Sequence, residues 1–184
     1  MAFPSVEQLT ELITPVAERH RMDVETVRIT RAGRKSVVAI GLGSDSRPDL
    51  DQLEVVSQEV STVLDDAETH GRYNFGAGYT LEVSTPGVDL PLTAPRHWRR
   101  NRHRLVKLTI EGKSETWRIG ALRADEGAVV LVGRDKKQPQ VKILEFTETP
   151  AAVVELEFAK PPAQELDLTG LNFEDALERG EDDK

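Results

Sequence analysis

The segment from Tyr79 to Leu92 constrains the fold of this chain more than any other, because an alternating strand runs directly into a rigid turn. Apolar and polar residues alternate from Tyr79 to Ser84, as in a strand with one buried face. Pro86 presets φ for the second position of a turn and Gly87 accepts a positive φ at the third. We therefore predict a type II turn over Thr85 to Val88, which stiffens the connection to whatever follows.

Two amphipathic helices and three strands are predicted up to this turn. A helix is expected to begin at Ser5, where Gln8 completes a capping box, and to kink or end near Pro15. Two strands joined around residues 32–35 form a hairpin, and a second helix starts at Asp49 with its apolar residues at three- and four-residue steps. This order predicts a two-layer α+β domain in which both helices cover one face of an open sheet.

After Pro91 the pattern changes to short strands separated by turn residues. The candidate strands span residues 104–110, 116–121, 128–132, 141–143 and 153–158. Short strands at this spacing predict a small closed β-barrel, since closure removes exposed strand edges. Beyond Lys160 acidic residues dominate, so a disordered tail is predicted. The predicted organisation is an α+β domain over residues 1–91, a barrel over residues 92–160 and an acidic tail over residues 161–184.

Charge is distributed unevenly along the chain. The net charge of −8 at pH 7 argues against a general preference for naked nucleic acid. Between Leu90 and Ile110, however, there is no Asp or Glu. Guanidinium groups in this stretch can pair with phosphates and an indole can stack on a base, so it is a candidate surface for RNA or another partner. The alternative is that the tryptophan covers the barrel and the arginines pair with the chain's own acids. The candidate residues are Arg96, Trp98, Arg99, Arg100, Arg102, Arg104 and Lys107.

No residue pattern in the chain indicates catalysis, a cofactor or a metal. The chain has no Cys, which excludes disulfides and thiolate metal sites. Gly41 and Gly43 follow a strand but lack the third glycine of a nucleotide loop, and a calcium loop counted from Asp45 fails at its glycine and glutamate positions. His97 and His103 lie in a positively charged stretch that would repel a cation. We also find no signal peptide and no apolar run long enough for a membrane span.

Two segments carry a resemblance to a known family. The motif Leu-Glu-Val-Ser-x-Pro-Gly-x-Asp-x-Pro-Leu over residues 81–92 resembles the mid-chain motif of the RimP family of ribosome maturation factors. The second predicted helix is similar to that family's second helix at Asp51, Val56, Ser57, Val60, Ser61, Leu64 and Asp65. Leu90 stands where the family often has Arg, and Thr85 and Val88 replace the commoner Ser and Leu. The resemblance extends from about Ser5 to about Phe158 and leaves out the acidic tail.

This resemblance implies a fold and a function. The fold would be a KH-like N-terminal domain followed by an SH3-like barrel. The protein would be a cytoplasmic factor required for assembly of the small (30S) ribosomal subunit. It would bind the immature subunit and assist incorporation of ribosomal protein S12 through the barrel, with 16S rRNA as a further candidate partner. The motif would connect the domains, with Ser84 and Asp89 holding backbone groups around the turn. Its residues are Glu82, Ser84, Pro86, Gly87, Asp89 and Pro91.

Two alternatives stay open from the residues themselves. The first is a stand-alone RNA-binding module unrelated to ribosome assembly, because the N-terminal order of elements is KH-like; the expected Gly-x-x-Gly phosphate clamp is not visible, however. The second is an enzyme of unknown type, for which no acid, base and nucleophile set has a recognisable spacing.

Overall fold

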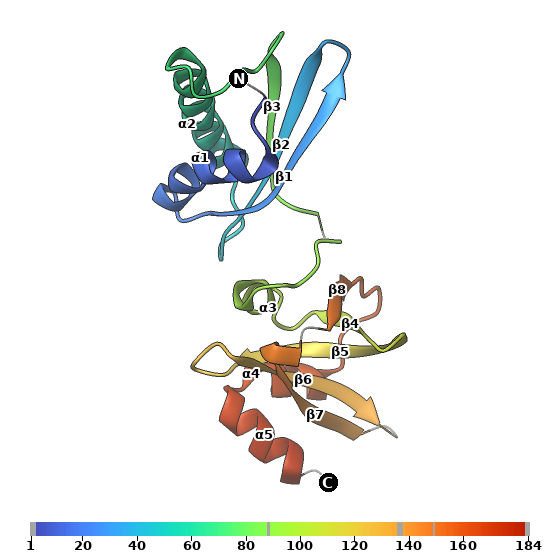
Figure 1. The fold of residues 1–184 in the computed structure, drawn as a ribbon. Coiled ribbons are helices and arrows are strands. Elements are labelled where there is room, and N and C mark those ends of the chain that lie inside the picture. The colour runs from blue at the N-terminus through green and yellow to red at the C-terminus, as the bar shows by residue number, and fades with distance from the viewer. Residues whose placement is uncertain (1–2, 88, 136–137, 149, 183–184) are drawn as a thin grey trace. The chain divides into compact units, whose positions relative to one another are not determined.

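The chain folds into two compact units, Met1–Gly87 and Val88–Lys184 (Figure 1). The structure is a computed structural model that describes residues 3–87, 89–135, 138–148 and 150–182. Each unit has its own sheet, its own helices and its own apolar core.

The N-terminal unit has the predicted order of helices and strands. It contains α1 (Val6–Arg19), β1 (Asp23–Ala32), β2 (Lys35–Gly43), α2 (Leu50–Thr69) and β3 (Tyr79–Ser84). The sheet order is β1-β2-β3. The hairpin strands β1 and β2 are antiparallel, whereas β3 runs parallel to β2 because α2 carries the chain back to the same end of the sheet.

Both helices of this unit begin at a capping box. The backbone N–H of Gln8 donates to Oγ of Ser5 (3.2 Å), and the Ser5 N–H donates to Oε1 of Gln8 (2.9 Å). Asp49 and Gln52 make the same reciprocal pair at 2.8 and 3.0 Å. These bonds satisfy N–H groups that have no partner within the helix, so the predicted helix starts are confirmed. The first helix does not end at Pro15 but continues to Arg19.

The N-terminal core lies between the sheet and its two helices. The alternate residues Val38, Ile40 and Leu42 of β2 face a cluster that α1 and α2 cover on one side. The prediction that both helices pack on one face of an open sheet is therefore confirmed. The cluster is completed by Leu9, Ile13, Val16, Ala17, Met22, Leu53, Val56, Val60, Leu64 and Phe75.

The C-terminal unit is built on five antiparallel strands, all of which the sequence predicted approximately. They are β4 (Leu105–Ile110), β5 (Lys113–Leu122), β6 (Ala128–Asp135), β7 (Gln138–Glu145) and β8 (Ala151–Glu155). The first four form a meander, and after the 3-10 helix η1 (Phe146–Glu148) strand β8 returns to pair with β4. The sheet order is thus β7-β6-β5-β4-β8. A short helix, α3 (Pro95–Arg100), precedes the sheet and was not predicted.

The five strands curl around one apolar cluster but do not form a closed ring of hydrogen-bonded strands. The edge strands β7 and β8 contribute Leu144 and Ala152 to the same cluster, together with Val106 of β4 and Leu131 of β6. Within the described residues, no pairing joins β7 to β8. The closed barrel predicted from strand spacing is therefore not found in strand pairing.

The prediction of a disordered tail over residues 161–184 was wrong for the residues described. This segment forms α4 (Ala163–Gly170) and α5 (Phe173–Asp182), and both helices pack against the sheet. Leu168, Phe173 and Ala176 are 2%, 6% and 0% exposed. A few well-placed apolar side chains bury the helices even though acidic residues are frequent in them.

The central strand β6 explains why these helices bind. From Ala128 to Val132 each residue is almost fully buried. Val129 and Leu131 face the cluster inside the curled sheet, whereas Val130 and Val132 face the helices. A strand with continuous apolar sequence is buried on both faces, and α4 and α5 supply the second cover.

Candidate functional site

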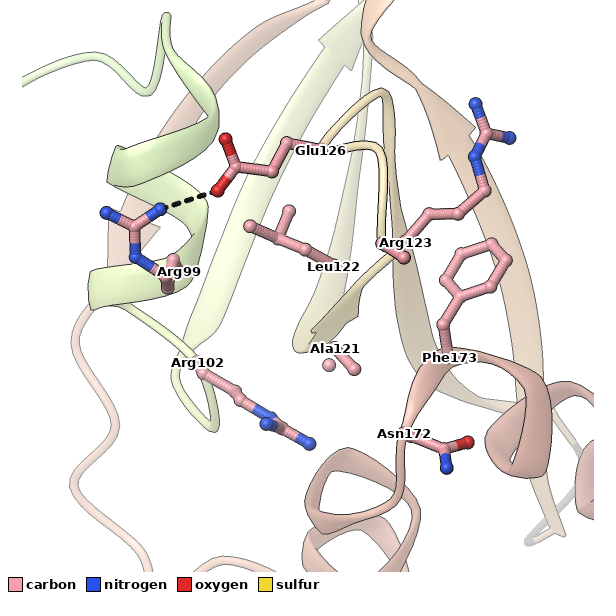
Figure 2. A pocket seen from close by; sticks show the side chains of 10 residues that line it. Arg99, Arg102, Ala121, Leu122, Arg123, Glu126, Asn172 and Phe173 are labelled. Carbon is pink, nitrogen blue, oxygen red and sulfur yellow. Dashed lines mark hydrogen bonds and ion pairs between the residues drawn. The ribbon is translucent and has the colours of Figure 1, made fainter.

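A cleft in the C-terminal unit lies beside the predicted basic stretch. It has a volume of about 340 Å³ and is open to solvent. Figure 2 shows that side chains of α3, the end of β5, the β5–β6 loop and the start of α5 meet around it. Its lining residues are Arg99, Arg102, Gly120, Ala121, Leu122, Arg123, Ala124, Glu126, Asn172 and Phe173. We call this feature the arginine cleft.

Arg99 is the cleft arginine best placed to exchange its partner. Its Nη1 donates to Oε1 of Glu126 at 2.9 Å, drawn as the dashed line in Figure 2. The side chains of this pair are 41% and 54% exposed. Exposed pairs of this kind contribute about 0–1 kcal/mol to stability. A phosphate or carboxylate from a partner can therefore replace Glu126 at small cost.

Arg102 serves mainly to hold the acidic C-terminal segment in place. Its Nε and Nη2 donate to the backbone oxygens of Thr169 and Leu171, each at 2.7 Å. These carbonyls lie at the end of α4, where a helix lacks its own donors and a positive charge is favourable. Next to it, Nδ1 of His103 lies 2.8 Å from Oγ1 of Thr169. Burial, together with the nearby cations Arg102 and Arg118, lowers the pKa of His103.

Arg123 lines the cleft but is directed to the strand β7. Its Nε donates to Asp125 at 2.8 Å, and Nη1 and Nη2 donate to Glu145 at 2.9 and 3.3 Å. Hydrogen bonds to the two carboxylates raise the pKa of Arg123, and the same bond to Asp125 lowers the pKa of that carboxyl. In Figure 2 its guanidinium points away from those of Arg99 and Arg102. The three arginines therefore do not converge on a single anion site.

A buried arginine below the cleft was missed in the sequence. Arg118 of β5 is 1% exposed and donates through Nη1 and Nη2 to Glu157 at 2.9 and 2.6 Å. Its Nε donates to Glu165 of α4 at 3.0 Å, and Nη1 also donates to the backbone oxygen of His103 at 2.9 Å. These bonds raise the pKa of Arg118, the bond to Glu157 having the largest effect. One signal was available: Arg118 begins the apolar second half of β5, where a buried charge needs acidic partners.

The predicted contact residues take different positions in the unit. Trp98 is only 3% exposed and packs its ring 5.8 Å from that of Phe146. With so little accessible surface, Trp98 is not placed to stack on a base in this structure; it packs in the core of the unit, which is close to the alternative expected from the sequence. Arg104 and Lys107 are exposed, whereas Arg96 and Arg100 are half-buried. Only Arg99 and Arg102 of the predicted set line the cleft.

His97 is a capping residue of α3. The backbone N–H groups of Thr93 and Ala94 both donate to its Nδ1 at 3.0 Å, and the side chain is buried. In the described part of the chain, no group of acidic or histidine side chains is arranged to hold a metal ion. A search of the same residues for a helix of the length and apolarity that a membrane crossing requires also finds none.

The predicted connecting motif is only partly described. Glu82 and Ser84 are exposed residues of β3. A side chain at Gly41 would lie 3.7 Å from the backbone of Pro86, so the chain leaves the sheet close to β2. Gly87 ends the first unit, and Asp89 and Pro91 are exposed in the second. The predicted type II turn includes Val88, which lies outside the described residues, and the connecting role of the motif stays a prediction.

The fold consists of two small α+β units, and the C-terminal unit presents a solvent-open cleft lined by arginines. Comparison with known proteins identifies the family. Residues 12–89 match the family described as the RimP N-terminal domain. The chain is 58% identical over 184 residues to the ribosome maturation factor RimP of Corynebacterium diphtheriae, with all of both chains covered. It is 49% identical to that of Corynebacterium aurimucosum over 95% of this chain and 94% of the other. It is 40% identical to the ribosome maturation factor RimP of Corynebacterium kroppenstedtii, over 95% of this chain and 98% of the other.

The chain belongs to the RimP family of ribosome maturation factors. The match over the whole chain includes residues 161–184, so the C-terminal helices have counterparts in at least one relative. The resemblance stated from the two sequence motifs is therefore confirmed.

Proposed function

We propose that this protein is a cytoplasmic maturation factor of the small (30S) ribosomal subunit. It binds the immature subunit and assists incorporation of ribosomal protein S12. The observation that carries this proposal is the 58% identity, over the full length of both chains, to a protein named ribosome maturation factor RimP. The specific subunit and the S12 partner come from the family resemblance.

The C-terminal unit offers a surface suited to a basic ribosomal protein. On α5 the carboxylates of Glu174, Asp175 and Glu178 are exposed. Complementary charge speeds the encounter with a cationic partner and disfavours wrong partners. Because α5 packs on the sheet through Phe173 and Ala176, these acids are held on a fixed surface rather than on a flexible segment.

We also infer that this unit is an SH3-like barrel. A four-stranded meander, a 3-10 helix and a last strand that returns to pair with the first support this assignment. The arginine cleft then provides a separate contact for 16S rRNA. There Arg99 would exchange Glu126 for a phosphate, because a charge-assisted bond to phosphate is at least as strong as the exposed pair it replaces. The exposed Arg104 and Lys107 would add to the same contact.

The class of function is tested by sedimentation. The protein should travel with free small subunits on a sucrose gradient of cell lysate and be absent from complete ribosomes. Its presence only at the top of the gradient, in low salt and after crosslinking, would contradict a role on the subunit and favour a stand-alone RNA-binding module.

The partner is tested with purified S12. Replacing two exposed acids of α5, Glu174→Gln with Glu178→Gln, should weaken S12 binding about fivefold, from about 0.5 kcal/mol for each exposed charge pair. The matched control is Glu7→Gln with Glu11→Gln, which removes two exposed acids from α1 in the other unit. Equal loss of affinity in both variants would show that only net charge matters and would contradict a contact at α5.

A further inference from the structure

The β1–β2 hairpin concentrates positive charge that the function proposed above does not use. Between Glu25 and Asp45 there is no Asp or Glu. Within this stretch four cations lie close together: Arg28, Arg31, Arg34 and Lys35. We call them the hairpin cations. The remainder of the N-terminal unit is acidic, with 14 Asp and Glu against four other Arg and Lys. Half of the unit's positive charge is therefore carried by one hairpin.

The hairpin cations lie at an end of the sheet that extends into solvent. Every residue from Thr30 to Lys35 is exposed. In Figure 1 strands β1 and β2 lead to a loop with neither helix beside it. Gly33 takes φ +69° at the first position of the two-residue loop, the conformation of a type II′ hairpin turn. The tight turn keeps the cations of both strands close to one another.

The unit's acids do not neutralise these cations. Among the residues described, no hydrogen bond or ion pair involves any hairpin cation. Two of the acids of α2 are engaged elsewhere: Glu59 pairs with Arg19 at 3.2 Å, and Asp65 accepts from the Tyr79 hydroxyl at 2.9 Å. Four like charges left unpaired repel one another, and an incoming polyanion relieves that repulsion.

The face of the sheet away from the helices carries two of these cations, Arg28 and Lys35, whereas the register places Arg31 beside Ser36 on the face that the helices cover. The strand register places Arg28 beside Ala39, and Thr30 beside Val37, with Thr80 next to Val37 on β3. At Gly41 a Cβ would collide with the Thr26 side chain, which covers this buried glycine. The register also places two carboxylates on this face: Glu82, which β2 separates from Arg28, and Asp23, which lies opposite Gly43 at the other end of β1. An extended polymer can lie against such a surface.

Protection of the sheet edge does not account for the hairpin cations. Charged side chains do keep an edge strand such as β1 from pairing with another chain. The acids of β1, Asp23 and Glu25, lie at its beginning, whereas its end near the hairpin loop carries only basic charge. Moreover, Arg34 lies in the loop and Lys35 begins β2, the central strand of the sheet, so neither protects the open edge of β1.

We propose that the hairpin cations bind the phosphate backbone of RNA, at a site separate from the arginine cleft. Guanidinium groups pair bidentately with phosphate, and the four side chains present such donors from one narrow ribbon. From Arg28 to Val37 the chain has no aromatic, Asn or Gln side chain. The hairpin therefore holds the backbone without reading base edges, and its binding is independent of base sequence. The choice of RNA as the polyanion rests on the proposed ribosomal function.

The test compares two double variants of the full chain that lose the same charge. Arg31→Gln with Arg34→Gln changes the hairpin. The control, Arg21→Gln with Arg47→Gln, changes exposed arginines near the other end of the same sheet, where Asp23 pairs with Gly43. Binding to a short labelled single-stranded RNA of mixed sequence is followed by fluorescence anisotropy over a range of KCl concentrations. A third variant, Arg31→Lys with Arg34→Lys, keeps the charge.

The hairpin variant should bind the RNA about tenfold more weakly at low salt. The slope of log K against log salt should also become less steep by about 1.4, since each of the two lost phosphate contacts reduces the slope by about 0.7. The control and the lysine variant should keep the slope of the unmodified protein. An unchanged slope in the hairpin variant would overturn the proposal. So would displacement of the RNA by polyglutamate at equal charge concentration, which would indicate a site for acidic protein.

The same variants are sedimented with immature small subunits. If the unmodified protein binds subunits while the hairpin variant keeps its salt slope, the hairpin inference fails and the proposed function stands. If the hairpin variant loses RNA but the unmodified protein never associates with subunits, the hairpin does bind phosphate and the proposed ribosomal function fails.

Discussion

The packing of the acidic C-terminal helices can be tested with one buried leucine. Leu168 of α4 is 2% exposed and contacts the outer face of the sheet beside Val130 and Val132. Replacing it with Ala removes buried carbon atoms and leaves a cavity, which costs about 3 kcal/mol at a well-packed site. A domain of this size is stable by about 5–15 kcal/mol, so the variant should lose a large part of that stability.

Tryptophan fluorescence isolates the relevant unit. The chain has two Trp residues, Trp98 and Trp117, and both lie in the C-terminal unit. Urea unfolding followed by this signal therefore reports on that unit alone. With a slope of about 1.5 kcal/mol/M, a loss of 3 kcal/mol lowers the urea midpoint by about 2 M.

The matched control is the same substitution at an exposed site of the same unit. Leu156 is 59% exposed, so Leu156→Ala should change stability by less than about 0.5 kcal/mol. If Leu168→Ala and Leu156→Ala unfold at the same urea concentration, α4 does not pack on the sheet and the reasoning is refuted.

Three further predictions concern the same unit. Deleting residues 162–184 should abolish the cooperative unfolding transition seen by fluorescence or cause aggregation, because the deletion uncovers the outer face of β6. A truncated protein with an unchanged urea midpoint would show that the helices contribute nothing to the stability of the unit. The pKa of Glu157 is lowered from 4.5, mainly by its hydrogen bond to Arg118. That stabilisation is fully present above the unfolded-state pKa and is lost as pH falls through the lower folded-state pKa. The unmodified protein should thus be more stable than Glu157→Gln at pH 7, and this difference in stability should shrink below about pH 4.5. Urea unfolding at each pH measures the difference. A difference that stays constant with pH would contradict the ion pair. Finally, Gly180→Ala should lower the melting temperature, because the added Cβ would collide with the Val141 side chain. The control Gly170→Ala should not, because a Cβ added there meets no atom within 4 Å. Equal melting temperatures of the two variants would show that α5 does not approach β7.

Local patterns in the sequence predicted most of the secondary structure. The Ser5 and Asp49 capping boxes, the hairpin around Gly33 and the strand from Tyr79 to Ser84 all depend on residues within a few positions of one another. Interactions over such short distances along the chain leave a periodic or positional signature that can be read directly. The two family motifs were likewise sufficient to place the chain in the RimP family.

The C-terminal segment was misread, and the two interpretations of the basic stretch could not be separated, because each segment was considered alone. The acidic tail has too few apolar residues to bury by itself, and the stretch around Arg102 seemed rich in unused positive charge. In the structure they bind one another: Arg102 and His103 hold the end of α4, and the buried Arg118 holds Glu165. The continuous apolar run of β6 was the one sequence sign that a second cover was needed.

The amino-acid sequence by itself determined the family, the elements of the N-terminal unit and the five strands of the C-terminal unit, but not α3, α4 and α5. Only the tertiary structure decided which cationic side chains are bound by other groups of the chain and which are exposed. Trp98 is buried, Arg102 and Arg118 are bound within the chain, and the hairpin cations make no ion pair among the described residues. The physical reason is that a charge's partners are set by contacts between residues far apart in the chain, which leave no periodic pattern in the sequence.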